Sequence, residues 1–275
     1  MRTCRKLTLV LTICVLTLMG PVAYGQTGDV PRPPFLTCPW EFEVAPYLWL
    51  PAVHGDLAVR GRTADIDLDL GDRLDLMFDG AKFLVAMGRA EARKGSLLFT
   101  LDVVYIGLED EGTTARGLET EVTSQFLITE FGAGYRLGTW PLSPDVLPAL
   151  SFDVLAGGRY VFLEAGIDID GGPRGRRVDI ERDMDWIEPF VGGRFLLTLS
   201  KRITIGVRGD VGGFGVGSDF TWNLVGSVQY HLSRHIALGG GYRALDIDYT
   251  QGSRANRSGV NVLIHGPLLG AVFRF

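Results

Sequence analysis

The sequence predicts an all-β fold: an antiparallel transmembrane β-barrel of about ten strands, with eight or twelve strands as the alternatives. The first observation is Val260–Phe275, where apolar residues recur at every second position up to a terminal aromatic residue. The second is that stretches of the same two-faced kind recur along the chain. The third is that short turns alternate with longer polar segments, as in outer-membrane barrels. For Val260–Phe275 alone, the final core strand of a soluble β-sandwich is the alternative.

The composition argues against one broad class of function and favours a curved sheet. The chain of 275 residues has a formal net charge of −5, whereas nucleic-acid binders are basic, so no nucleic-acid partner is expected. Its 37 glycines recur inside apolar runs rather than in one linker. Glycine permits tight bends and the close approach of two backbones, and a curved, closed sheet needs both.

Residues 1–25 have the pattern of a secretory signal peptide. Basic residues come first, an apolar centre covers Leu7–Met19, and the small residues Ala23 and Gly25 precede the expected cleavage site before Gln26. An N-terminal membrane anchor is the alternative, but the apolar run is short for a spanning helix. The sequence therefore predicts export from the cytoplasm.

The exported chain divides into a short lead-in and one large domain. Residues 26–39 are rich in proline and are expected to lie in the periplasm, and residues 40–275 form the predicted barrel. After the signal there is no apolar run of about 18 residues. Because lipid offers no partner to an open strand edge, the chain can enter a membrane only as a closed barrel. The predicted location is the cell outer membrane, in contact with its lipid and lipopolysaccharide.

The strands are predicted from alternation, because successive side chains of a strand point to opposite faces. Several of them reach the ~10 residues that a membrane-spanning strand needs, whereas strands of soluble sheets are typically about five or six residues long. In chain order the predicted strands are Trp40–Ala52, Ala81–Arg93, Ser96–Leu108, Thr120–Leu137, Ala149–Ala165, Trp186–Leu199, Ile203–Val211, Asp219–Tyr230, Ile236–Tyr249 and Val260–Phe275.

Two segments leave the number of strands open. Gly55–Phe78 and Ile167–Asp185 are polar and are predicted to be outer loops, but each could contain a hairpin. The first is expected to contain a hairpin of its own and a short helical turn around Asp72–Met77. The polar segment Glu109–Gly117 is expected to be a further loop. The turns at 94–95, 200–202 and 231–234 are short and are predicted to share the periplasmic side with both ends of the barrel.

Charged residues occupy the face of each strand opposite its apolar face. A barrel of eight strands is just filled by its side chains, so ten strands lie near that limit. Arginine pairs well with carboxylates through its planar fork. We therefore predict that these charges form a network that plugs and stiffens the bore, with a narrow, charge-lined pore for ions or small solutes as the alternative. They are Arg89, Glu91, Arg93, Asp102, Glu130, Arg136, Asp153, Arg159, Glu188, Arg194, Arg208, Asp210 and Arg243.

Other functions have weaker support in the sequence. A surface enzyme such as a hydrolase could use His54 and His265 near the outer rim, but no spacing specifies a catalytic triad, and no catalytic residue is assigned. An adhesin or ligand-binding barrel could use its outer loops. The acidic outer segments are interpreted as loop charges that are exposed to solvent. Gly212–Gly217 is not followed by the helix that a nucleotide-binding loop requires. No metal site and no cofactor are predicted.

The end of the chain carries a second predicted signal. Phe273 and Phe275 share the apolar face of the last strand, while Arg274 faces inward or lies at the rim. A terminal phenylalanine with apolar residues at alternate positions is similar to the signal that barrel-assembly machinery reads. That machinery is the partner expected during biogenesis.

Five segments spread from end to end of the mature chain carry a resemblance: WEFEVAPYLWLP (40–51), EARK (91–94), GDVGGFGVGSDFTW (209–222), GYRALDIDY (241–249) and GPLLGAVFRF (266–275). With these segments the chain resembles a family of uncharacterised, porin-like Gram-negative outer-membrane β-barrel proteins. The resemblance implies a single barrel domain, without catalytic residues to carry over.

Overall fold

A computed structural model describes residues 39–59, 62–68, 82–113, 119–144, 147–169, 178–251 and 258–275. All of them belong to one compact unit, Pro34–Phe275. The predicted signal peptide, nearly all of the proline-rich lead-in and the helical turn expected at Asp72–Met77 lie outside the described residues. Among the described residues, no helix is long and apolar enough to cross a membrane.

The described residues form twelve β-strands. The strands are β1 (Trp40–Trp49), β2 (Ala52–Val59), β3 (Arg62–Leu68), β4 (Lys82–Lys94), β5 (Leu97–Thr113), β6 (Glu119–Pro141), β7 (Ala149–Ile169), β8 (Val178–Thr198), β9 (Ile203–Gly212), β10 (Phe220–His231), β11 (Ile236–Gln251) and β12 (Ser258–Arg274).

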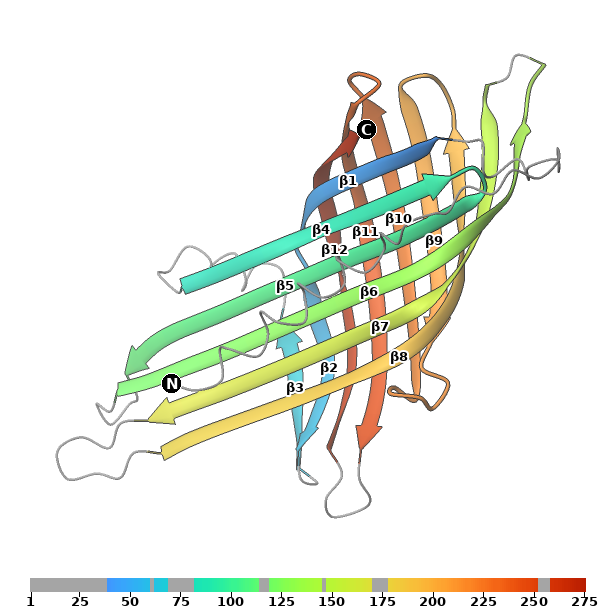
Figure 1. The fold of residues 1–275 in the computed structure, drawn as a ribbon. Helices are drawn as coiled ribbons and strands as arrows, with labels where there is room; N and C mark the ends of the chain where they lie inside the picture. The colour runs from blue at the N-terminus through green and yellow to red at the C-terminus, as the bar shows by residue number, and fades with distance from the viewer. Residues whose placement is uncertain are drawn as a thin grey trace, which may run out of the picture. The chain divides into compact units, whose positions relative to one another are not determined.

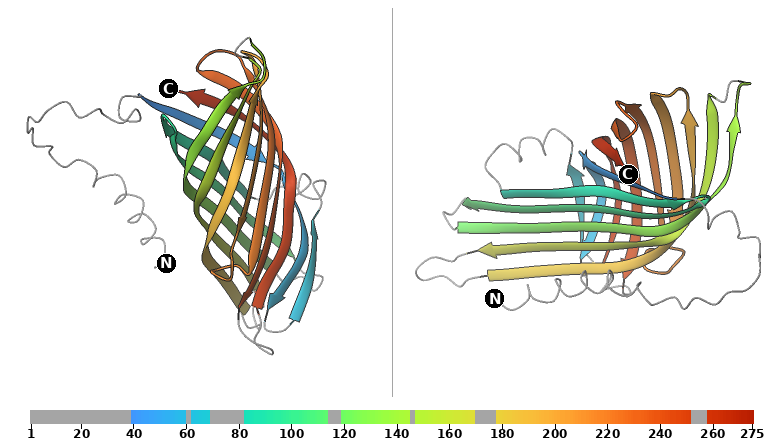
Figure 2. Two further views of the ribbon diagram at one scale, coloured as in Figure 1. Left: turned by 90° about the vertical axis from the view of Figure 1, so that its right-hand side faces the viewer. Right: turned by 45° about the horizontal axis from the view of Figure 1, so that its top comes forward.

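Ten of these strands close into an antiparallel ring (Figures 1 and 2). From β4 to β12 each strand pairs with the next, β1 pairs with β4, and β12 returns to β1. The backbones of Phe42 and Phe275 complete the closure through two hydrogen bonds, with N···O distances of 3.2 and 2.9 Å. The predicted antiparallel barrel of about ten strands is confirmed.

The two remaining strands form a hairpin that continues the first strand. Trp49 lies opposite Leu268 and Ala52 lies opposite His265, so β1 and β2 pair with β12 in one register. Between them stands Pro51, which has no N–H group to donate to a ladder. The hairpin expected within Gly55–Phe78 is therefore present, and it begins slightly earlier than predicted, because strand pairing between β2 and β3 covers residues 53–59 and 62–68.

Three strands also extend into segments that were predicted to be loops. β5 continues to Thr113, β7 continues to Ile169, and β8 begins at Val178. The predicted loops Glu109–Gly117 and Ile167–Asp185 are thus partly strand. The prediction ended each strand where charges interrupted its apolar face, but β6 and β7 remain paired as far as Thr120 and Ile169. Backbone pairing does not require an apolar face.

The barrel has two unlike ends. The connections at 95–96, 199–202 and 232–235, with the described residues 142–144 and 147–148, lie with Phe275 at one end, which we call the short-turn end (top and upper right in Figure 1). At the opposite, long-strand end, β4–β8 diverge from the group formed by β10–β12 with β2 and β3 (Figure 1). Consistent with this divergence, β8 pairs with β9 only over Phe190–Thr198.

A layer of buried apolar side chains fills the bore toward the long-strand end. One side of this apolar layer comes from β5–β8 and the other from β1, β11 and β12, and the Trp186 and Tyr249 rings stack across it with centroids 4.1 Å apart. This apolar layer inside the bore was not predicted from the sequence. Its buried members are Trp49, Val104, Ile128, Val161, Trp186, Leu245, Ile247, Tyr249, Val260, Val262 and Ile264.

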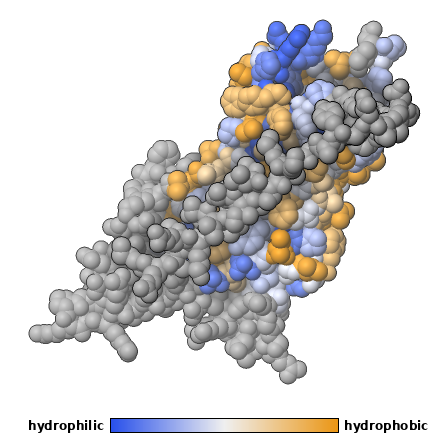
Figure 3. All heavy atoms as spheres, in the orientation of Figure 1, coloured by the Kyte–Doolittle hydropathy of each residue, from blue (hydrophilic) through white to orange (hydrophobic). Residues whose placement is uncertain are grey.

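The outer face of the barrel is apolar and exposed over many strands. Figure 3 shows hydrophilic residues at the upper end and hydrophobic residues on the outer surface below them. Aromatic and branched aliphatic residues, which suit the pleated surface of a sheet, dominate this face. Its exposed members include Phe99, Leu101, Phe131, Tyr135, Ile187, Val191, Phe195, Val207, Leu224, Val228, Leu238 and Leu269.

Replacing Ile128 with alanine is expected to lower the free energy of unfolding by about 2–5 kcal/mol, because it truncates a fully buried side chain and leaves a cavity. Urea titration of the barrel in lipid vesicles, followed by tryptophan fluorescence, measures the change. The matched control is Ile187→Ala, whose exposed side chain leaves a space that lipid or detergent fills. Equal losses in the two variants would contradict a packed layer around Ile128.

Candidate functional site

The structure places every charge predicted on the inward face inside the bore, where the charges form two connected clusters. We call the first the central cluster; it lies next to the apolar layer and contains Asp102, Glu130, Arg159, Glu188, Arg208, Asp210 and Arg243. We call the second the end cluster; it lies toward the short-turn end and contains Arg89, Glu91, Arg93, Arg136, Asp153 and Arg194.

Arg159 of β7 is the most completely enclosed charge of the central cluster. Its side chain has no exposed surface. Its Nε lies 3.1 Å from Oε1 of Glu130, its Nη1 lies 2.8 Å from Oε1 of Glu188, and its Nη2 lies 2.5 Å from Oδ1 of Asp210. The partners come from β6, β8 and β9. The fixed fork of the guanidinium therefore joins four neighbouring strands from inside.

Glu130 connects this arginine to the other side of the bore. Its carboxylate also accepts hydrogen bonds from Nη2 of Arg208 at 2.8 Å and from Nη2 of Arg243 at 2.5 Å. Arg243 stands on β11, and its Nη1 lies 3.4 Å from Oδ1 of Asp102 on β5. Hydrogen bonds thus cross the bore between strands that are not neighbours in the ring.

Neutral side chains complete the central cluster, and they were not among the site residues predicted from the sequence. The Tyr47 hydroxyl donates to Asp102 at 2.7 Å. Asn223 donates its Nδ2 to Asp210 at 2.8 Å and accepts from Nε of Arg243 at 3.1 Å. Both residues stand at inward positions on their strands, and that periodicity could have identified them.

The glycine-rich segment Gly212–Gly217 is a tight turn between β9 and β10. Gly213 and Gly217 have φ angles of 84° and 77°, a conformation that glycine adopts without steric cost. A Cβ atom on Gly217 would lie 2.4 Å from the carbonyl oxygen of Ile187. The close approach brings Ser218 to Glu188, to which its hydroxyl donates. The turn therefore serves the central cluster directly.

The end cluster contains more arginines than carboxylates. Asp153 accepts from Nε of Arg136 at 2.7 Å and from Nη2 of Arg194 at 2.7 Å. Glu91 accepts from Nη1 of Arg194 at 2.6 Å and from Arg93 at 2.9 Å. Arg89 adds a longer bond of 3.2 Å to Glu91. The two carboxylates are each shared among several cations.

No family model matches this chain, and no curated protein matches it. Several solved structures resemble its fold. The outer membrane protease OmpT from Escherichia coli is 10% identical, with 87% of this chain and 98% of that chain covered and a TM-score of 0.45. The attachment invasion locus protein Ail of Yersinia pestis is 10% identical, with 86% and 98% covered and a TM-score of 0.35.

A third solved structure has a similar level of likeness. The translocator domain of the autotransporter NalP from Neisseria meningitidis is 11% identical, with 86% of this chain and 88% of that chain covered and a TM-score of 0.36. The likeness to all three proteins concerns the general fold alone.

The two histidines considered for catalysis come together on the outer face of the barrel. The His54 and His265 rings stack with centroids 5.2 Å apart, and the Tyr242 hydroxyl shares a hydrogen bond of 2.5 Å with Nδ1 of His265. Tyr242 is 50% exposed. Within the described residues, no group of three or more histidine, cysteine or acidic side chains could hold a metal ion.

Replacing Arg159 with methionine is expected to destabilise the barrel by about 3–5 kcal/mol, because its three buried carboxylates lose their shared cation. Urea titration in lipid vesicles measures the loss. Arg202→Met is the control, since Arg202 is exposed and the bond that it donates to the Tyr230 hydroxyl is 3.3 Å long. A loss below about 1 kcal/mol for Arg159→Met would show that these contacts do not hold the strands together.

Proposed function

We propose that this protein is an integral outer-membrane β-barrel with a bore that is closed to solutes, so that it serves as a structural barrel rather than as a pore. The observation that carries the proposal is the fully enclosed Arg159, bonded to three carboxylates directly beside the apolar layer. A solute crossing the bore would have to pass both the central cluster and the apolar layer.

Energetics favour the closed bore over the narrow pore. Breaking a buried ion pair typically costs about 3–5 kcal/mol, and Arg159 takes part in three such pairs. The apolar layer is made mostly of hydrocarbon and aromatic rings, so it offers a permeating ion few hydrogen-bonding partners in exchange for its water. Wide aqueous channels are found in barrels of about 16–18 strands, whereas this ring has ten.

The outer face supports the membrane location. Membrane strands need ~9–11 residues with an apolar outward face and are bordered by aromatic residues. Trp40 and Phe42 stack at the short-turn end with ring centroids 6.1 Å apart, and Phe275 of the same end is 77% exposed. In this proposal the short-turn end faces the periplasm, residues 1–25 are the cleaved signal, and lipid and lipopolysaccharide surround the barrel.

The length of the strands favours a second candidate function, binding at the cell surface. β6 has 23 residues, and β7 and β8 have 21 residues each. These lengths are about twice what a membrane span needs. The remainder of each strand would project beyond the outer leaflet and present a paired sheet to a surface ligand. The hydrolase alternative has less support, because the pair of His54 and His265 lies on the outer face.

The purified protein is expected to give no stepwise currents in a planar bilayer, because the central cluster and the apolar layer block the bore. A variant that combines Arg159→Ser and Glu188→Ser with Trp186→Gly and Tyr249→Gly removes the three ion pairs of Arg159 and the ring stack. If this variant retains heat-modifiable gel mobility, it is expected to conduct. Regular single-channel steps from the unaltered protein would refute the closed bore.

Replacing Phe275 with alanine is expected to lower the yield of folded barrel in the outer membrane several-fold, because the assembly machinery would lose its terminal signal. The yield is measured as the heat-modifiable fraction in isolated membranes. Phe214→Ala is the matched control, an exposed phenylalanine far from the end of the chain. Equal yields for the two variants would remove the assembly role of Phe275.

A further inference from the structure

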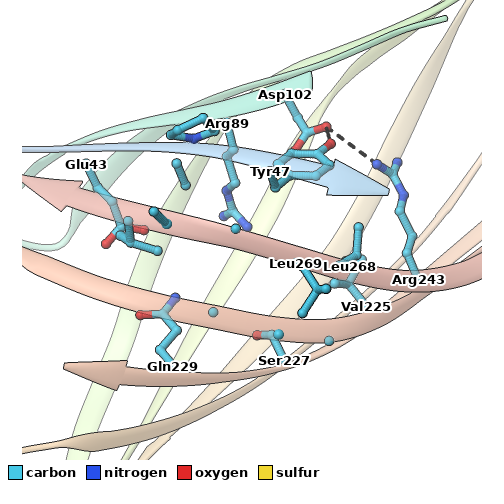
Figure 4. Close-up of a pocket in the computed structure, with 18 of the residues that line it drawn as sticks. Glu43, Tyr47, Arg89, Asp102, Val225, Ser227, Gln229, Arg243, Leu268 and Leu269 are labelled. Atoms are coloured by element: carbon cyan, nitrogen blue, oxygen red, sulfur yellow. Dashed lines mark hydrogen bonds and ion pairs between the residues drawn. The ribbon is translucent and has the colours of Figure 1, made fainter. Parts of the chain in front are cut away.

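Two adjoining cavities lie between the central cluster and the short-turn end. Their volumes are about 130 and 220 Å³. We call them together the inner chamber. Figure 4 shows the first cavity, with the Arg89 guanidinium reaching into it from β4 between Glu43 and Tyr47. The residues that line both cavities are Glu43, Arg89, Arg208, Val225, Ser227 and Gln229.

The charges around the inner chamber do not balance. In the end cluster, the four arginines 89, 93, 136 and 194 face the two carboxylates Glu91 and Asp153, which leaves a net charge of +2. The central cluster on the other side has three arginines and four carboxylates, so the two clusters together carry a net charge of +1. At the mouth, Glu43 is neutralised by Arg274, whose Nε lies 2.9 Å from its carboxylate. Glu41 also lines the second cavity, but its side chain is exposed and screened by solvent.

Several arginine side chains in this region have N–H donors without a hydrogen-bond partner among the described residues. Among the described residues, Nε of Arg208 and Nη1 of Arg93 are buried without a hydrogen-bond partner. Arg208 is 93% buried and lines both cavities. Arg89 donates to Glu91 alone within the described residues. An unsatisfied buried donor typically costs ~1–3 kcal/mol, and more when it is charged, so these groups favour an acceptor.

Glycines on β11 leave the chamber open. Gly239 stands at an inward position and lines the first cavity. A Cβ atom added to it would meet its nearest neighbour at 3.9 Å, an ordinary contact distance. The absence of a side chain at this position therefore keeps space beside Ser227 and Gln229, whose polar groups could also contact a ligand.

We propose that the inner chamber binds a small oxyanion of the phosphate class, held by Arg89, Arg208 and Arg93. The excess of arginine in the end cluster favours an anion. Arg89 donates to Glu91 alone within the described residues, so its guanidinium has N–H groups left to donate to the oxygens of that anion. Arginine forks suit phosphate geometry because they donate two parallel hydrogen bonds. The anion enters from the short-turn end, since the central cluster closes the other side. It stabilises the barrel and does not pass through it.

The test is the thermal unfolding midpoint of the full-length mature protein in an uncharged detergent. Inorganic phosphate is titrated against sodium chloride at matched ionic strength, so that free phosphate is the sole phosphate present. A ligand that binds the folded state alone raises its stability as its concentration rises. We expect phosphate to raise the midpoint beyond the chloride control. No excess over chloride would overturn the proposal.

Two variants locate the effect. Arg89→Gln removes a charged donor and is expected to weaken phosphate binding at least about tenfold in isothermal titration. Gly239→Leu fills the chamber while keeping every charge and is expected to abolish the phosphate-dependent shift. Its control is Gly226→Leu, on the outer face of β10, where an added Cβ atom meets nothing within 4 Å. A full shift that persists in either chamber variant, or that Gly226→Leu also loses, would overturn the assignment.

Discussion

The contacts of Arg159 with its three carboxylates are the constraint on which the rest of the structure depends. The guanidinium fork bonds to side chains of β6, β8 and β9. A shift of one residue in any of these strands would turn its inward face toward lipid, because side chains alternate along a strand. The buried charges would then lose their partners in a low-dielectric setting, at a cost of several kcal/mol each. The ion cluster therefore specifies the register of the wall as well as filling it.

The inward face changes its chemistry along the barrel axis. On β4, Arg89 and Glu91 belong to the end cluster, whereas Met87 on the same face packs against the apolar layer. On β8, Arg194 and Glu188 are followed toward the long-strand end by Trp186. The bore is thus charged near the short-turn end and apolar toward the other, and the Trp186–Tyr249 stack lies in the apolar part.

The closed bore that we propose would move any function of the protein to its two ends. At the short-turn end, the excess of arginine surrounds a chamber that an anion can neutralise. At the long-strand end, β6–β8 extend well beyond the length of a membrane span. The central cluster separates these regions, because Arg243 and Asp102 bond across the bore between them. Each end can therefore be altered without exposing the other.

The sequence by itself determined the barrel, its approximate strand number and the charges that face inward, because alternation within a strand is a local property. Asp102, Glu130 and Arg159 could all be assigned to the bore from their neighbours in the chain. Only the tertiary structure decided which charges meet. Arg243 and Asp102 are 141 residues apart, and their contact follows from closure of the ring. Strand length was also a tertiary outcome, because β5, β7 and β8 continue wherever a neighbouring backbone offers hydrogen bonds, whatever the hydropathy of their side chains.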